Sequence, residues 1–263
     1  ITSTDVGDLT VARYDLTGVT STTYGYCMGG IWPDSNNTII EKFTLASDAN
    51  ATDVGDLLSS LADGSGTSSE TYGHHCGGYP NTNVIQRFAF STDGNATDHG
   101  DLAITHSSGA GMNSQTYGYV SGGNGGNRQR CKFAFASNTT AVDDGDHFAG
   151  HHTYVDGVSS ETHGYVVGGA VSGAGSSNII DKFAYASGGD STDVGDLSQA
   201  SYSGCGVSQT DYGYKGGGNG TTDNDRIEKW TFASDNNSVD TTANMLSINS
   251  GSQSHGYMGP AQY

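Results

Sequence analysis

Two clusters of acidic and amide side chains could bind a divalent cation, because carboxylate and amide oxygens are the ligands that calcium prefers. Each cluster places four such side chains within nine residues, with the same spacing. The members are Asp48, Asn50, Asp53 and Asp56 in the first cluster, and Asp93, Asn95, Asp98 and Asp101 in the second. The spacing differs from that of a standard calcium loop, and Asp and Asn also bond to turn amides without a metal. We therefore favour turn chemistry and keep a calcium site as the alternative.

A second group of side chains could bind a sugar. Aromatic rings offer flat apolar faces for stacking, and Asn, Asp and Arg can bond to hydroxyl groups. The candidates all follow a recurring Gly pair, and they are Trp32, Asp34, Tyr79, Asn81, Asn127, Arg128, Asn219 and Asp223. Binding residues are often found in loops on a rigid scaffold, so we predict ligand binding here. Ordinary surface loops are the alternative.

The sequence contains no motif of a common catalytic site. It has no G-x-S-x-G, no H-E-x-x-H and no phosphate-binding loop. His74 and His75 are adjacent, so on a strand they point to opposite faces and cannot readily chelate a metal together. His74 also stands where other repeat units have Tyr, which predicts a packed side chain. We expect a protein that is not an enzyme.

Composition and charge exclude several classes of protein. The chain has 41 Gly, 15 Tyr and only 3 Pro, and its formal net charge is −18. Such a composition favours strands and turns over helices, and the charge disfavours nucleic acid and anionic lipid as partners. No run of 18 apolar residues is present, so we expect no membrane insertion. The four Cys residues are widely spaced, which predicts free thiols rather than a disulfide framework.

Three signals recur in a fixed order along the chain, with a period of about 45 to 50 residues. The first is an acidic phrase with the letters T-D-V-G-D-L or a close variant. Its copies begin near residues 4, 52, 97, 142, 192 and 239. The second is an aromatic-glycine strand that ends in a Gly pair, with copies near residues 24–30, 72–78, 117–123, 163–169, 212–217 and 255–259.

The third signal is a run of mostly alternating apolar and polar residues, as a strand with one buried face requires. Its copies are residues 39–45, 84–90, 130–135, 179–185 and 227–232. Each run is followed by a cluster of Asp, Gly and Asn that suits a tight turn. The chain then returns in the acidic phrase, and the Gly- and Ser-rich stretch after it has room for one more short strand.

Four strands per unit predict an all-β propeller built from four-stranded blades. The chain holds about five and a half units, so we predict a single domain over residues 1–263 with six blades, and five as the alternative. The staggered ends predict a ring closed by the N-terminal strand, which would hide two sheet edges.

The order of these signals resembles the kelch repeat, a propeller family that also includes galactose oxidase. The resemblance rests on the Gly pair after an aromatic strand, as in residues 24–30, followed by a strand such as residues 39–45. The sequence departs from kelch where a Trp is usual on the returning strand, because the acidic phrase stands there. No copper motif like that of galactose oxidase is present, so an enzyme of that type ranks last among the functions considered.

The phrase Asn-Ala-Thr-Asp-Val-Gly-Asp-Leu, as in residues 50–57, together with Tyr-Gly-Tyr and Gly-Gly, also resembles repeats in predicted tail or structural proteins of marine phages, cyanophages especially. This resemblance implies a structural or receptor-contacting propeller of a virus particle, such as a tail fibre or appendage. The implied partners are other virion proteins, further copies of the chain or a host-surface glycan, and the implied location is the virion or the extracellular space. An extracellular carbohydrate-binding propeller of cellular origin is the alternative.

Overall fold

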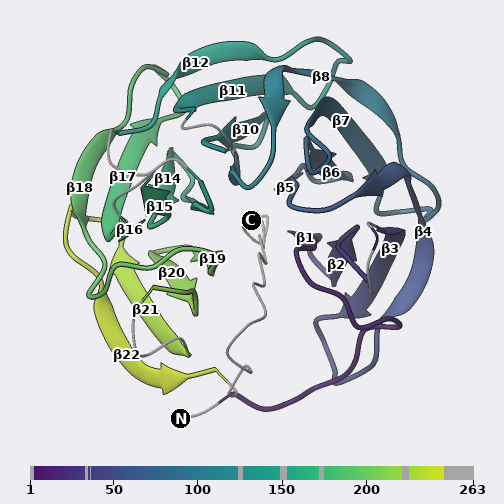
Figure 1. Cartoon of the computed structure of the whole chain (residues 1–263), viewed down its shortest axis with the longest axis horizontal. Helices are drawn as coiled ribbons and strands as arrows, with labels where there is room; N and C mark the ends of the chain where they lie inside the picture. Colours follow the sequence, from purple (N-terminus) through teal and green to yellow (C-terminus); the bar gives the residue numbers. More distant parts are fainter. Residues whose placement is uncertain are drawn as a thin grey trace.

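The computed structural model shows five four-stranded antiparallel sheets around a common axis (Figure 1). It describes residues 3–32, 35, 37–123, 127–148, 153–171, 175–220 and 225–245. Each sheet is one blade, with its first strand nearest the axis and its last strand at the rim (Figure 1). The predicted all-β propeller of four-stranded blades is confirmed.

The strands follow the repeat along the chain. Blade 1 contains β1 (Thr17–Thr20), β2 (Tyr24–Met28), β3 (Asn37–Thr44) and β4 (Thr52–Leu61), and blade 2 contains β5 (Ser65–Ser68), β6 (Tyr72–Cys76), β7 (Thr82–Ala89) and β8 (Thr97–His106). Blade 3 contains β9 (Ala110–Asn113), β10 (Tyr117–Ser121), β11 (Gln129–Ala134) and β12 (Val142–Asp146). Blade 4 contains β13 (Asp156–Ser159), β14 (His163–Val167), β17 (Ile179–Ala184) and β18 (Thr192–Asp196), with a small hairpin of β15 (Ala170–Val171) and β16 (Gly175–Ser176) between its second and third strands. Blade 5 contains β19 (Cys205–Gln209), β20 (Tyr212–Gly216), β21 (Arg226–Thr231) and β22 (Val239–Asn244).

The inner strands pack closely because each has a Gly at its second position. A Cβ on Gly66 would lie 2.2 Å from the carbonyl oxygen of Gly18 in the blade before, and one on Gly111 would lie 2.0 Å from that of Gly66. Gly157 and Gly206 repeat this approach in blades 4 and 5. All residues of β1, β5, β9 and β13 are buried as a result.

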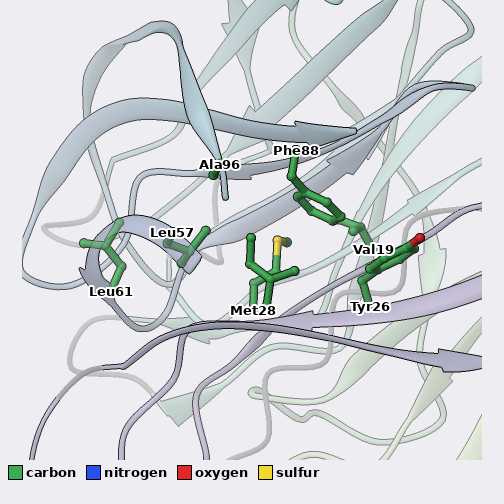
Figure 2. Close-up of a cluster of buried hydrophobic side chains, with 8 residues drawn as sticks. Val19, Tyr26, Met28, Leu57, Leu61, Phe88 and Ala96 are labelled. Atoms are coloured by element: carbon green, nitrogen blue, oxygen red, sulfur yellow. The ribbon is translucent and has the colours of Figure 1, made fainter. Parts of the chain in front are cut away.

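The core lies between the blades. In Figure 2, Val19, Tyr26 and Met28 of blade 1 face Phe88 of blade 2. Phe88 also covers Gly73 of its own blade, where a Cβ would lie 2.6 Å from the ring. Equivalent clusters fill the next three interfaces, so blades 2, 3 and 4 bury both faces against their neighbours, as a propeller requires.

A repeated contact also joins the rim of each blade to the next blade, and we call it the edge contact. At the first interface, Asp56 donates its backbone N–H to Asn95 Oδ1 (3.1 Å), and the N–H of Ala96 donates to the carbonyl of Asp56 (2.8 Å). The acidic phrase therefore holds the turn of the following blade. Asp146 and Asp196 make the same pair of contacts at later interfaces.

The described residues form five blades, the number given as the alternative, rather than the predicted six. The sixth aromatic-glycine copy, near residues 255–259, lies outside them. The predicted closing strand is not observed either, because residues 3–11 are not paired as a strand. In the fifth unit, the Gly pair is shifted by one residue to Gly217 and Gly218, since these two adopt the positive φ values of the other pairs.

The described residues contain no helix, and hence none that could cross a membrane. All four Cys residues are free, with Cys76 and Cys131 buried.

Candidate binding face

One end of the blades gathers two kinds of segment, and we call it the loop face. It carries the loops between the second and third strands and the crossovers from each blade to the next. Backbone bridges tie the loops of blades 1, 2, 4 and 5 to the crossover entering the same blade. The pairs are Tyr14 with Ile31, Ala62 with Tyr79, Thr153 with Ala170, and Tyr202 with Asn219. The opposite end, the turn face, carries the hairpins between the first and second strands and the turns before the acidic phrases.

The recurring Gly pair holds two crossovers at the loop face. In blade 1, Gly29 and Gly30 have φ values of +61° and +97°, which favour glycine. A Cβ on Gly29 would lie 2.3 Å from the carbonyl oxygen of Leu61, and one on Gly30 would lie 2.8 Å from that of Tyr14. The pair is therefore a packing device that fixes where each loop begins.

Trp32 and Tyr79, predicted to bind ligand, are both on the loop face and both exposed. Their exposed fractions are 49% and 54%. Their backbones are fixed, since Trp32 donates its N–H to the carbonyl of Ser35 (2.9 Å) and Tyr79 donates to that of Ala62 (2.7 Å). Two aromatic rings are thus presented to solvent from an ordered backbone.

The predicted polar residues of the same loops make contacts within the fold. Asn81 Oδ1 accepts a hydrogen bond from Ser107 Oγ (2.9 Å), and Asn127 Oδ1 accepts one from the N–H of Gln129 (2.9 Å). Arg128 forms a partly exposed ion pair with Asp146 (3.0 Å). Asn219 exchanges backbone hydrogen bonds with Tyr202. Asp34 and Asp223 lie outside the described residues.

Five residues encircle the axis at the loop face, and we call them the axial ring. They are Asp15, Asp63, Ser108, Tyr154 and Ser203, each three residues before the inner-strand Gly, and all have φ between 53° and 58°. The backbone N–H groups of the last four members each donate to the carbonyl of the preceding member, over 2.7–3.0 Å. This chain of hydrogen bonds places five side chains side by side around the axis.

Two carboxyl groups of the axial ring have altered acidity. Burial, and then the charge of Asp63, raise the pKa of Asp15 to about 7. Burial raises the pKa of Asp63 to about 6, although a hydrogen bond from Ser108 opposes the shift. Burial and the charges of both carboxylates also raise the pKa of Tyr154. Near pH 7 the ring therefore offers both ionised and protonated oxygen groups.

The two Asp and Asn clusters lie away from this ring, at the turns and rim strands. Asn50 Oδ1 accepts the N–H of Asp8 (3.0 Å), and Asn95 Oδ1 accepts that of Asp56. Asp53 and Asp98 accept the N–H groups of the Gly residues two positions later. These contacts fit the turn interpretation. Within the described ranges, no group of three or more His, Cys, Asp or Glu side chains is arranged to hold a metal ion.

His74 packs as predicted, with its ring stacked 4.9 Å from that of Phe135. Burial lowers the pKa of His74 to about 3 and the pKa values of His75 and His106 to about 4. These neutral rings belong to the blade interior rather than to the loop face.

No family model matches this sequence, and no curated protein matches it.

The sequence analysis missed the axial ring and its aromatic neighbours. Tyr14, next to Asp15, is 41% exposed, and the rings of Tyr154 and Tyr202 lie 6.0 Å apart. The sequence does mark these residues by their position, because every member of the axial ring precedes the inner-strand Gly by three residues. The residue types share no pattern, so a search for recurring letters does not find them.

Proposed function

We propose that this chain is a non-enzymatic binding module whose loop face contacts a partner surface. The observation behind this proposal is the exposure of Trp32 and Tyr79 at positions whose backbone N–H groups are hydrogen-bonded at the loop face. Large exposed aromatic side chains on a rigid scaffold are common anchors of binding sites. The blade interior supplies the scaffold and does no chemistry of its own in this account.

The ligand class that fits best is carbohydrate, such as a host-surface glycan. Exposed rings can stack on the apolar face of a sugar, and Tyr14 adds a third ring near the axis. In the axial ring, Asp15, Ser108 and Ser203 are buried. The partly buried Asp63 and Tyr154 add one carboxyl group and one phenol, which can hydrogen-bond to sugar hydroxyls. The acidic surface, with a net charge of −18, disfavours nucleic acid as the ligand.

We place the module in a virus particle, as a tail fibre or appendage that contacts the host, with other virion proteins or further copies as neighbours. The support for this setting is the resemblance of the repeat to predicted structural proteins of marine phages. An extracellular carbohydrate-binding propeller of cellular origin is the second candidate, favoured by the same aromatic loops. The two differ in one outcome, because only the virion setting predicts the chain in purified particles at a fixed stoichiometry.

We further propose that the complete ring has six blades and that the N-terminal segment forms the rim strand of the sixth. The support is the edge contact of Asp8, which copies that of Asp56. Asp8 donates its N–H to Asn50 Oδ1 (3.0 Å), and Ala51 donates to the carbonyl of Asp8 (2.8 Å). Residues 3–9 therefore sit on blade 1 as the rim strand of a preceding blade would.

The test is binding of the purified chain to a glycan array and to whole bacterial cells, with the single variants Trp32→Ala and Tyr79→Ala. Each variant should weaken saturable binding by about tenfold or more, because an anchoring ring is lost. The matched control is Tyr117→Ala, which removes a partly exposed Tyr on the turn face and should bind as the unaltered chain does. Absence of saturable binding, or equal loss in all three variants, would contradict a site on the loop face.

A further inference from the structure

The four blade interfaces share one aromatic contact. A ring on the second strand of one blade stacks on a ring just after the third strand of the next blade. The pairs are Tyr26 with Phe90, His74 with Phe135, Tyr119 with Tyr185, and Tyr165 with Phe232, with centroids 4.9–5.0 Å apart and planes within 27°. A complete interface between two blades therefore contains one such stacked pair of rings.

Among the residues that the structure describes, two blade faces lack that contact, and they border the same sector of the ring. On blade 1, Leu45 occupies the position of Phe90 and is 50% exposed, and Phe43 is only partly buried where Phe88 and its equivalents are buried. On blade 5, Tyr214 occupies the position of Tyr26 and is likewise only partly buried. Incomplete burial is thus found where blade 1 and blade 5 face the sector between them.

The N-terminal segment runs as a coil along the rim of this sector (Figure 1). Besides the edge contact of Asp8, the N–H of Thr10 donates to Glu41 Oε1 (2.8 Å), as Leu58 donates to Gln86 Oε1 (2.6 Å) at the next interface. At its other end, the N–H of Ser3 donates to the carbonyl of Asn244 in β22 (3.0 Å). The segment therefore spans from blade 5 to blade 1 along the rim and leaves the inner positions to another part of the chain.

The sequence after β22 resembles the first two strands of a blade. Residues 252–256 read S-Q-S-H-G, and residues 69–73 read S-E-T-Y-G in the hairpin of blade 2. In that hairpin Ser69 Oγ accepts the N–H of Tyr72 (2.9 Å), and Ser21 and Ser114 act alike. Tyr257 then falls at the position of Tyr26. Asn249 replaces the inner-strand Gly, so the match is strongest over the hairpin and second strand.

The same segment also lacks charged side chains, as buried segments usually do. Residues 246–263 contain no Asp, Glu, Lys or Arg, in a chain with 38 such residues (10 basic and 28 acidic). They include Leu246, Ile248, Tyr257 and Met258 as apolar side chains. An uncharged segment of this kind is suited to an interface that is closed to water.

We propose that residues 246–263 dock between blades 5 and 1, with Tyr257 packed on Leu45. This inference rests on the six-bladed ring of the proposed function but not on its ligand. It makes the exposed face of blade 1 an interaction surface for a named segment of the same chain, rather than for a partner protein.

The experiment measures maleimide labelling of Leu45→Cys in the full chain. The matched control is Leu58→Cys, since Leu58 is also a Leu with about the same exposure (55%) and lies on the rim strand β4. Native thiols give a low background, because burial raises the pKa of Cys27 to about 11 and also raises that of Cys205. Labelling of Leu45→Cys should be about tenfold slower or more than labelling of Leu58→Cys, since a docked residue reacts only after local opening.

Two further variants make the outcome decisive. Adding Tyr257→Ala, or deleting residues 246–263, should raise the labelling rate of Leu45→Cys to that of Leu58→Cys. Equal rates in the full chain would overturn the proposal. Protection of Leu45→Cys that disappears on dilution would overturn it too, because it would assign the surface to a second copy. Neither result depends on glycan binding, so this proposal and the proposed function can fail separately.

Discussion

The blade interfaces and the loop face of this propeller differ in how closely they repeat. The interfaces repeat the same stacked rings and edge contacts, with distances that vary by tenths of an ångström. The loop face starts from the same Gly pairs but then presents different side chains, such as Trp32 and Tyr79. Repeated contacts serve stability, which every blade needs, whereas a varied surface can serve recognition. Changes at interfaces should therefore cost stability, and changes on the loop face should cost binding.

The largest expected effect on stability comes from an interface ring. Phe183 is buried against Tyr119 of the preceding blade, and the guanidinium of Arg130 lies 3.5 Å from its centroid. Phe183→Ala should lower the free energy of unfolding by about 3–5 kcal/mol, as large-to-small changes in cores do. Urea denaturation measures this, with the half-exposed Phe148→Ala as the matched control. Similar losses in both variants would break the distinction between interface and surface.

A buried ion pair should have the next largest effect. Lys215 of blade 5 contacts Asp156 of blade 4, and both side chains are almost fully buried. Lys215→Met should cost about 3 kcal/mol, because it leaves the carboxylate buried without its cation. The double variant Lys215→Met with Asp156→Asn should recover a large part of that loss. A double variant as unstable as the single one would show that packing, rather than charge, dominates at this interface.

The axial ring predicts a pH dependence of smaller size. The pKa of Asp15 is about 7 in the fold and lies near 3.8 when unfolded, so the folded chain retains a proton that the unfolded chain releases. Stability from this group is present below pH 4 and is lost as the pH rises towards 7. Asp15→Asn should therefore gain stability relative to the unaltered chain as the pH rises from 4 to 7, by at most about 1.4 kcal/mol per pH unit.

Thermal unfolding of both proteins across that range measures the difference. The histidine contributions, which act in the opposite direction, are common to both proteins and cancel. A difference between the two proteins that stays constant with pH would refute the assigned acidity of Asp15.

The smallest expected effect concerns calcium. Because Asn50 and Asn95 bond to backbone N–H groups, we expect EDTA to leave the melting temperature unchanged within about 1 °C, and added calcium to do the same. A stabilisation of several degrees by calcium, abolished in Asp53→Asn, would instead support a metal site at the turns.

The sequence predicted those parts of the fold that repeat by residue type. The acidic phrase, the Gly pair and the third-strand run each recur in letters, and they correspond to β4, to the loop after β2 and to β3 in blade 1. The shift of the fifth pair to Gly217 and Gly218 escaped notice because Gly216 extends the run of glycines. The number of blades was harder to predict, since the sixth aromatic-glycine copy is not followed by a third-strand run.

The candidate site was predictable only in part. Trp32 and Tyr79 were identified because large aromatic residues stand out in loops of small ones. The polar residues are weaker candidates for ligand binding, because the side-chain oxygens of Asn81 and Asn127 accept hydrogen bonds within the fold. The axial ring could not be found from residue types, since backbone conformation and hydrogen bonds, rather than side chains, define it. The spacing to the inner-strand Gly is what relates Asp15 to Tyr154.

Hydrogen exchange of the chain in the presence and absence of a bound glycan would show which end of the blades recognises a ligand. The account predicts slower exchange in the loop-face segments 29–32 and 77–82 and in the crossovers at residues 13–15 and 61–63, with no change in the turn-face hairpins at residues 20–24 and 68–72. Protection confined to the turn-face hairpins would contradict the account, because it would assign recognition to the end of the blades where the contacts repeat.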